Sequence, residues 1–436
     1  NIKERGRPQP GRMFLVSFNE GRIIGDEELK HQLSSQQPYG QWLKENKITF
    51  SDLPKPNDIP SMDSETLLTL QRAFGYTSEE LRMITTPMAA GGYEAIGSMG
   101  NDASLAVLSD QNHILFNYFK QLFAQVTNPP LDAIREELVT SSQSFIGSEQ
   151  NLFTETPIHC RQLKLELPII TNEEIDSIRN SKLSGLATIT LNTVFSVKTG
   201  NGSLKTALDK LCEQASQAID DGYSLIILSD RAVDSDHAPI PSLLATGAIH
   251  HHLIREGNRT KIGIIVESGE PREVQHFALL IGYGAGAINP YVALETCKSL
   301  AESGELNNSD PHNAESNFIK ANVKGLIKVM SKMGISTVPS YRGAQIFEAI
   351  GLNQDVIDKY FTWTPSPVEG IGLDVIEAET LERHRTSFET DLLPGEQDLD
   401  VGGQYQWRRH GEHHQWNPDA IAKLQFATKA NSWKMY

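Results

Sequence analysis

Short apolar runs alternate with amphipathic segments through the second half of the chain. From about residue 186, runs rich in β-branched residues, such as 225–228 and 262–266, are each followed by a stretch with apolar residues at helical spacing. The clearest of these stretches spans 204–219 and carries Leu204 and Leu208 on one face. Strands that are apolar throughout and alternate with helices are typical of a parallel sheet that is covered on both faces.

The same pattern gives the expected elements and their order. It predicts strands at 187–191, 225–228, 262–266, 287–288 and 335–338, and helices at 241–255, 272–281, 317–333 and 344–350, with a helix that contains 204–219 and a further helix from about 292. About five or six such units predict an α/β domain built as an irregular (β/α) barrel, with an open doubly wound sheet as the alternative.

Two flanking segments differ from this central pattern. Residues 1–50 contain two short strands and a helix, which bury little apolar area alone, so we expect them to be the end of a preceding domain. Residues 51–395 form the central domain, which begins with a helical lead-in. Residues 396–436 resemble the opening of another domain, and we expect both ends to continue into a longer chain. The flanking segments are therefore expected to be the least stable parts.

Composition narrows the classes of function. Among 436 residues, 39 Lys and Arg face 55 Asp and Glu, and the net charge of −16 argues against nucleic acid or an anionic membrane as a partner. The three cysteines, Cys160, Cys212 and Cys297, lie far apart and predict neither a disulfide framework nor a metal or iron–sulfur site. The uncharged stretch 277–294 is interrupted by glycines and an Asn-Pro pair, so no membrane span is predicted.

The candidate chemistry lies where the predicted strands end. Loops at the carboxyl ends of parallel strands face a common crevice, and ligands bind there in α/β folds. The polar residues expected at these ends include Asp230, Arg231, Glu267, Asn289 and Arg342. They could bind an anion or a small polar ligand, or the charged ones could pair with one another and close the mouth of the barrel. Pairing is the expected arrangement, because no recognisable nucleophile or metal-ligand set accompanies them.

Three other motifs invite functional interpretations that their spacing does not favour. The consecutive histidines at 250–252 point about 100° apart on a helix, so they cannot converge on one metal ion. His410, His413 and His414 lie among tryptophans and arginines and are expected to form a solvated or interface face. The glycine-rich loop 282–287 follows a helix and precedes a strand, the reverse of the order that presents a helix N-terminus to phosphate.

A set of strings along the chain identifies a known family. They are RPQPGRM at 7–13, AFGYT at 73–77, YFKQLFAQVTNPP at 118–130, IHHHLIR at 249–255, MSKMGIS at 330–336, SYRGAQIFEAIG at 340–351 and GIGLD at 370–374. In this order and at these distances, the chain resembles the central region of the glutamate synthase large subunit over essentially its whole length.

The resemblance implies a place inside a larger enzyme. In that family a glutaminase domain comes first and an FMN-binding barrel with a three-iron four-sulfur cluster comes last, and ammonia from glutamine reaches the site that uses 2-oxoglutarate. Residues 1–50 would then carry the end of the glutaminase domain, and the string WRRHGEHHQWNP at 407–418 would lead into the FMN synthase domain. Both domains would be partners within the same polypeptide, in the cytoplasm or, for a plant-type enzyme, in the plastid stroma.

The resemblance implies no chemistry for the central region itself. It is expected to be a relative of the flavin barrel without a cofactor, and its cysteines lie in none of the family's catalytic or cluster motifs, so no catalytic residue is carried over. The expected role is a non-catalytic domain that connects the flanking domains and supports ammonia transfer. The alternatives are a free-standing barrel enzyme, with a flavin or phosphate ligand, or a metabolite-binding module, each with its ligand at the carboxyl ends of the strands.

Overall fold

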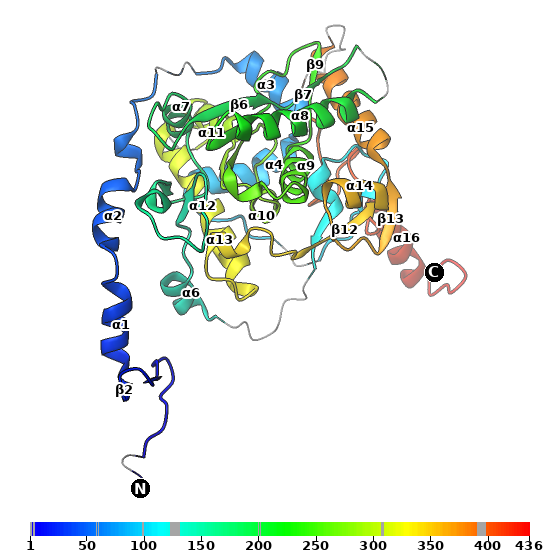
Figure 1. The fold of residues 1–436 in the computed structure, drawn as a ribbon. Coiled ribbons are helices and arrows are strands. Elements are labelled where there is room, and N and C mark those ends of the chain that lie inside the picture. Colours follow the sequence, from blue (N-terminus) through cyan, green and yellow to red (C-terminus); the bar gives the residue numbers. More distant parts are fainter. Residues whose placement is uncertain are drawn as a thin grey trace.

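The computed structural model describes residues 2, 5–57, 59, 61–97, 100–122, 131–198, 200, 202–306, 309–389 and 398–436. Figure 1 shows an α/β body from which the N-terminal segment extends as an arm. The last eight residues of the motif at 118–130, and the predicted domain boundary at 395, lie outside the described residues.

A four-stranded parallel sheet lies at the centre of the body. Its strands are β6 (Thr188–Asn192), β8 (Leu225–Ser229), β10 (Gly263–Glu267) and β11 (Ala287–Asn289), hydrogen-bonded in the order β11-β10-β8-β6. Every residue of β8 and β10 is buried, as the apolar residues before the terminal Ser229 and Glu267 predict. On the free side of β11, Ile169 forms a further parallel bridge with Ile288.

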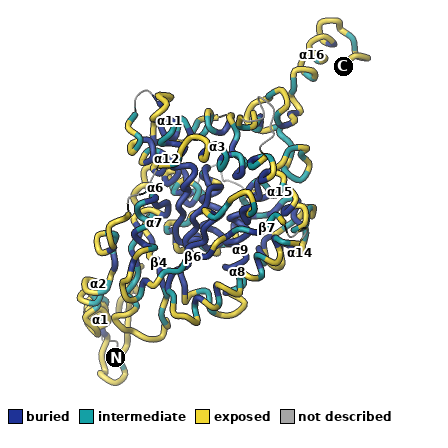
Figure 2. Tube along the Cα trace, turned by 90° about the horizontal axis from the view of Figure 1, so that it is seen from above, coloured by how far each residue is buried: buried dark blue, intermediate teal, exposed yellow. Residues whose placement is uncertain are grey.

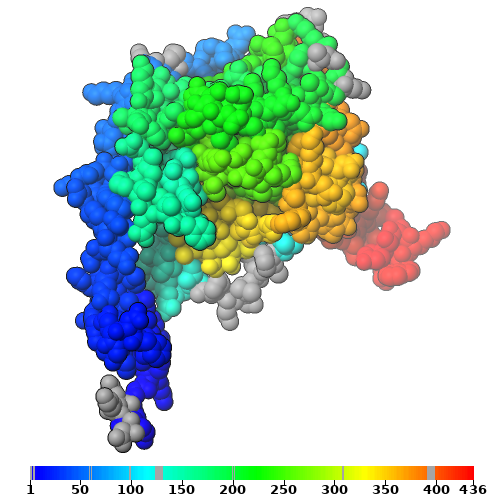
Figure 3. Space-filling view, in the orientation of Figure 1, coloured from blue at the N-terminus to red at the C-terminus, as the bar shows by residue number. Residues whose placement is uncertain are grey.

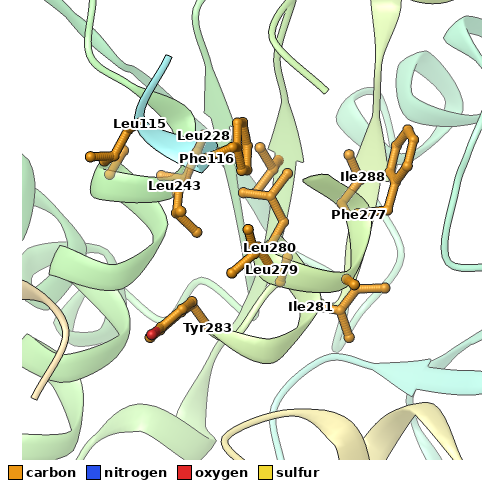
Figure 4. Packing of buried hydrophobic residues seen from close by; sticks show 14 of the residues in the cluster. Leu115, Phe116, Leu228, Leu243, Phe277, Leu279, Leu280, Ile281, Tyr283 and Ile288 are labelled. Atoms are coloured by element: carbon orange, nitrogen blue, oxygen red, sulfur yellow. The ribbon is translucent and has the colours of Figure 1, made fainter. Parts of the chain in front are cut away.

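Successive strand residues point to opposite faces of this sheet and enter two different cores. Ile226 and Ile264, which are in register, belong to the larger core, part of which is shown in Figure 4. Ile227 and Ile265 belong to a smaller core with the hairpin strands β4 (Ser144–Ile146) and β5 (Leu163–Leu165). Each fully buried Ile contributes about 1.5–3 kcal/mol. The larger core also takes residues from α8 (Ser203–Asp220), α9 (Ser242–Arg255), α10 (Val274–Gly282), α11 (Tyr291–Glu302) and α12 (Pro311–Lys332).

A second sheet corrects two predicted elements. It contains β3 (Phe119–Gln121), β12 (Phe347–Leu352) and β13 (Val368–Ile371), in the order β13-β12-β3. The predicted helix at 344–350 is wrong, because strand β12 occupies most of it, with buried and half-buried residues alternating. The predicted strand at 335–338 is also wrong, because α13 (Val338–Tyr341) begins at its end with Pro339 in the first turn. Within the described ranges no strand pair joins the two sheets, so hydrogen-bonded strands do not close a barrel there.

The remaining elements are mostly short and surround these two sheets. They are β1 (Leu15–Ser17), β2 (Arg22–Ile24), α1 (Asp26–Ser34), α2 (Tyr39–Asn46), α3 (Ser64–Ala73), α4 (Ser78–Glu80), α5 (Thr86–Gly91), α6 (Ala133–Val139), α7 (Asn172–Arg179), β7 (Val194–Ser196), β9 (His237–Pro239), α14 (Gln354–Tyr360), α15 (Leu373–Phe388) and α16 (Pro418–Lys429). The predicted α/β class is therefore confirmed. A helix long and apolar enough to cross a bilayer is not found in the part of the chain that the structure describes.

The two ends of the chain leave the body in different ways. Figure 3 shows the N-terminal arm standing off the body, and Figure 2 shows α16 projecting beyond it. Between the body and α16, the chain forms a parallel bridge from Asp400 to Thr77 and an antiparallel bridge from His414 to Ala103. Residues 398–416 are therefore packed against the body.

Candidate functional site

Strands of the parallel sheet end side by side at its carboxyl edge. The register pairs Glu267 of β10 with Ser229 of β8 on one side and with Asn289 of β11 on the other. Because the strands are parallel, the residues that follow them enter loops on the same edge. The structure thus brings Arg231, Glu267 and Asn289 together, and places Asp230 beside them.

Glu267 is the buried centre of this edge. Its exposed fraction is 0%. Arg231 donates from Nε to Oε1 at 2.6 Å, and Arg179, at the end of α7, donates from Nη2 to Oε2 at 2.6 Å. Burial alone would raise the pKa of Glu267, but the two guanidinium charges outweigh burial and lower the pKa. The carboxylate is therefore ionised, and its charge is compensated within the chain.

Asparagine side chains connect the rest of the edge. Asn172 Oδ1 accepts hydrogen bonds from Arg231 Nη2 at 3.2 Å and from Asn289 Nδ2 at 3.1 Å. The same Nδ2 donates to the carbonyl of Ile170 at 3.0 Å. The Arg231 guanidinium also lies over the Tyr291 ring, 4.1 Å from its centroid. These contacts fix Arg231 in the orientation that pairs it with the buried carboxylate.

Sequence reasoning missed Asn172 and Arg179, the two residues that α7 contributes to this edge. Thr171 and Glu174 form a capping box, which marks the position as the start of a helix and gives no reason to expect a role at the sheet. The signal that could have found them is the apolar pair at 169–170. It bridges to β11, so the helix that follows it begins at the same edge.

Asp230 has different partners from its neighbour Arg231. It is 1% exposed, and its two carboxylate oxygens accept from the backbone N–H of Gly269 at 3.1 and 3.3 Å. Burial raises the pKa of Asp230 to about 7. The protonated form of this carboxyl group is therefore favoured far more than in an exposed Asp. The pairing expected among the strand-end charges is present between Arg231 and Glu267, and Asp230 stands outside it.

Arg342 lies at the opposite edge of the sheet. It follows α13 and not a strand, because the last strand predicted from the sequence is absent. The next residue, Gly343, donates its N–H to the carbonyl of Gly282 at 2.9 Å, in the loop that leads into β11. Burial lowers the pKa of Arg342, and the charge of Glu149 offsets this only in part. The structure therefore does not bring Arg342 to the strand-end cluster.

The histidines at 250–252 and the glycine loop 282–287 are accounted for by packing and chain direction within the fold. His250 is buried and accepts from Arg259 Nε at 2.9 Å, whereas His251 and His252 are half-buried. The glycine loop 282–287 is the turn from α10 into β11. In the described parts of the chain, no three His, Cys, Asp or Glu side chains are grouped as ligands for a metal ion.

Two of the thiols, at Cys212 and Cys297, are poor nucleophiles. Burial raises the pKa of Cys212 to about 11 and raises that of Cys297 further. Both thiols are therefore protonated at neutral pH, and the thiolate is the form that attacks a substrate or binds a metal.

The carboxyl edge of the sheet can bind an oppositely charged group through an ion pair. Both oxygens of Glu267 already form such pairs with arginines of the chain.

A second polar centre, which sequence reasoning missed, holds residues 398–416 against the body. Glu79 of α4 is 3% exposed. Its carboxylate accepts from the backbone N–H groups of Gly403 at 2.8 Å, Tyr405 at 3.1 Å and Gln406 at 3.0 Å. Three consecutive or nearly consecutive N–H groups that converge in this way form an anion-binding nest. Here the anion is a side chain of the protein itself.

Two more carboxylates complete this contact. Glu412, on the C-terminal segment, accepts from Ser109 Oγ at 2.7 Å and lies 3.0 Å from His113 Nε2. Asp102, on the body, lies 2.8 Å from Nδ1 of His414. We call Glu79, Asp102 and Glu412, with the groups that they bind, the C-terminal clamp.

A cavity of about 550 Å³ lies beside this clamp. Arg272 and Arg383 line it. Arg272 donates to Glu80 at 3.0 Å, and Arg383 donates to the carbonyl of His113 at 2.8 Å. Charges of both signs line the cavity, and some of them already bind one another. The cavity is therefore part of the polar contact between the body and the C-terminal segment.

Comparison with known proteins adds two matches to sequence families. A family profile described as glutamate synthase central domain matches residues 69–353. A profile described as class-II glutamine amidotransferases matches residues 1–42, the N-terminal arm. The two matches follow each other along the chain, so the arm and the body are similar to different families.

Named relatives match the chain along its whole length. It is 47% identical over 436 residues to the glutamate synthase (NADPH) large chain of Bacillus subtilis, which covers 100% of this chain and 28% of that protein. It is 40% identical to the glutamate synthase (NADH) of Schizosaccharomyces pombe, over 100% of this chain and 21% of that protein. It is also 40% identical to the chloroplastic ferredoxin-dependent glutamate synthase of Oryza sativa subsp. japonica, over 99% and 27%. The chain thus spans less than a third of these relatives.

Among solved structures, a mandelate oxidase variant has 13% sequence identity and a TM-score of 0.31, over 59% of this chain and 93% of that one. A similarity at this level carries no argument about fold or function.

Proposed function

Because this chain belongs to the glutamate synthase family, we propose that it acts as a non-catalytic central domain between a glutaminase domain and an FMN-binding synthase domain of one polypeptide. The amidotransferase match at 1–42 supports a glutaminase neighbour on the N-terminal side. The C-terminal clamp supports a fixed connection at the other end, because it holds the segment that leads into α16 against the body.

The closed carboxyl edge of the sheet carries the non-catalytic part of this proposal. In a ligand-binding α/β domain, that edge offers unpaired polar groups to the ligand. Here both oxygens of Glu267 are bound by arginines, and Arg231 is also bound by Asn172. Oδ1 of Asn289 has no hydrogen-bond partner among the described residues, but the residue is 0% exposed. A ligand would have to displace ion pairs that are held by buried neighbours.

A role in ammonia transfer follows from the position that we propose. The central domain would hold the two reaction sites at a constant separation, so that ammonia released from glutamine reaches the site of glutamate formation from 2-oxoglutarate. The support is that the chain makes specific contacts at both of its ends, through the bridge of Ile48 to Leu163 and through the clamp.

We propose further that FMN and the iron–sulfur cluster bind elsewhere in the enzyme. The glycine loop 282–287 does not fit a flavin phosphate, because it joins the end of α10 to a strand and opens no helix N-terminus. The absorption spectrum of the purified chain should show no flavin or iron–sulfur bands. Isothermal titration with FMN should show no binding, and micromolar affinity would contradict the proposal.

The scaffold role is tested by removing one arginine from the closed edge. In a full-length glutamate synthase that carries this chain, Arg231→Ala should lower the free energy of unfolding by about 2–4 kcal/mol, because Glu267 is buried. Arg385→Ala, which removes exposed ion pairs to Glu382 and Glu389, is the control, with an expected loss below about 1 kcal/mol. Both half-reactions, glutamine hydrolysis and reductive glutamate formation from ammonia, should persist in each variant. Loss of the second half-reaction in folded Arg231→Ala would place the edge in the chemistry.

A further inference from the structure

A second cavity, of about 500 Å³, lies between helix α12 and the segment that leads into α7. We call it the α12 pocket. Apolar side chains line it, among them Ile169, Ile319 and Val323. Charged side chains of both signs line it as well, and they include Glu173, Glu174, Glu315, Lys320 and Lys324.

Helix α12 presents these groups in two neighbouring rows. Glu315 and Ile319 lie one turn apart in a buried row, and Lys320 and Lys324 lie one turn apart in the adjacent exposed row. Residues one turn apart on a helix have side chains about 5–6 Å from each other. A carboxylate, an apolar surface and two ammonium groups therefore line one side of the same small cavity.

Glu315 lines this pocket and has a covered carboxylate oxygen without a hydrogen-bond partner in the described part of the chain. The residue is 4% exposed, and its Oε1 has no hydrogen-bond partner. Its Oε2 lies 3.6 Å from Nζ of Lys298, and the same ammonium group lies 3.3 Å from Glu295. One cation is thus shared by two buried carboxylates. A buried carboxylate oxygen without a donor is costly, so a donor that enters the pocket would be bound favourably.

We propose that the α12 pocket binds a free α-amino acid with an apolar side chain. The ammonium group of the amino acid donates to Oε1 of Glu315, and its carboxylate faces Lys320 and Lys324. The side chain packs on the apolar surface that includes Ile319 and Val323. An amine without a carboxylate would leave the two lysines unused, and a carboxylate without an amine would leave Glu315 without its donor. The combination of groups therefore favours a zwitterion.

Three related compounds test this assignment on the unmodified 436-residue chain. They are L-leucine, isoamylamine, which is leucine without its carboxylate, and 4-methylpentanoate, which is leucine without its amine. Titration calorimetry should show binding of L-leucine, with each of the other two compounds at least about tenfold weaker. If isoamylamine or 4-methylpentanoate binds as tightly as leucine, or if leucine gives no binding at millimolar concentration, the proposal is wrong.

A pair of matched variants then locates the site. Glu315→Gln keeps the size of the side chain and removes its charge, so leucine affinity should fall at least about tenfold. Glu166→Gln is the control, because Glu166 lies at the same pocket but already binds Lys164 at 2.5 Å and Gln143 at 2.6 Å. The affinity of Glu166→Gln for leucine should stay within about twofold of that of the unmodified chain. Equal binding by Glu315→Gln and the unmodified chain would overturn the proposal.

The exposed lysines provide a variant that does not depend on the buried carboxylate. If Glu315→Gln fails to fold, as judged by circular dichroism, the double change Lys320→Ala and Lys324→Ala is measured in its place. Both lysines are exposed, so the fold should tolerate the change. Leucine affinity should fall about tenfold while isoamylamine binding stays unchanged. Unchanged leucine affinity in this variant would contradict the role given to the lysines.

Discussion

The two ends of the chain are attached to the body by different chemistry. The N-terminal arm, residues 2 and 5–46 as described, has many of its hydrogen bonds within itself, such as those from Arg22 to Glu28, and helices α1 and α2 contain no buried residue. The C-terminal segment 398–416 is held by the buried carboxylates Glu79 and Glu412. Exposed ion pairs contribute little to stability, whereas a buried carboxylate cannot lose its donors without a large cost.

The difference shows what each end is adapted to contact. The β1–β2 hairpin exposes Phe14, Val16 and Phe18, the last of which is 92% exposed, so the described part of the chain leaves much of their apolar surface uncovered. The clamp, by contrast, satisfies its polar groups on the body. The sequence predicts that both flanking segments are the least stable parts, because neither buries much apolar area alone. Buried hydrogen bonds, which apolar patterning does not reveal, separate them.

Removal of either end is the strongest test of this difference. Deletion of 398–436 should lower Tm by about 3 °C, because the unfolding entropy grows with chain length and a loss of roughly 3 kcal/mol then shifts Tm by about 1 °C per kcal/mol in a chain of this size. Deletion of 1–46, which leaves the buried Ile48 in place, should lower Tm by less than about 1 °C. Calorimetry of the two truncated chains checks both values. Equal shifts would mean that the arm packs on the body as firmly as the clamp does.

A single substitution can separate the clamp from the rest of the C-terminal segment. Glu79→Gln removes the charge that three backbone N–H groups bind, so the free energy of unfolding should fall by about 2–3 kcal/mol. Hydrogen exchange at residues 403–406 should become faster in the same variant. Urea unfolding measures the first effect, with Glu20→Gln on the arm as the control.

Glu20 is exposed and pairs with Arg22, so its replacement should leave unfolding and exchange unchanged. If Glu79→Gln unfolds like the unmodified chain, the nest contributes no stability and the two ends differ only in apolar burial.

The parallel sheet could be predicted because its central strands are apolar up to the polar residue that ends each of them. Residues 225–229 and 263–267 are buried on both faces, and that arrangement leaves a direct mark in the sequence. Strand β12 has no such continuous apolar run in its sequence. Its sequence is compatible with a helix, and pairing with β3 and β13 decides its conformation.

The same reason explains which parts of the candidate site were found. Arg231 and Glu267 could be placed together because each directly follows or ends a well-predicted strand. Arg342 was assigned to the same edge only through the strand wrongly predicted at 335–338. The clamp could not be predicted at all, since Glu79 and Gly403 are 324 positions apart and a charged residue in a polar stretch is usually exposed.

The smallest predicted effect is a pH dependence of the clamp that the arm lacks. His414 lies between two acceptors, with Nδ1 2.8 Å from Asp102 and Nε2 2.5 Å from the carbonyl of Gly403. Only the doubly protonated ring can donate to both. Burial alone would lower the pKa of His414, but the hydrogen bonds to Asp102 and Gly403 outweigh burial and raise the pKa.

A raised pKa in the folded state means that the folded chain binds this proton more tightly than the unfolded chain does. The stability from His414 is therefore fully present below the unfolded value of about 6.5 and is lost as the pH rises through the folded pKa. The free energy of unfolding, measured in urea between about pH 6 and pH 8.5, should decline as the pH rises in the unmodified chain. It should decline less in His414→Gln. His31→Gln, on the exposed face of the arm, is the control and should decline as the unmodified chain does. If the free energy of unfolding of His414→Gln declines equally, proton binding by His414 does not stabilise the contact of the C-terminal segment with the body. The two ends then differ through Glu79 and Glu412 alone.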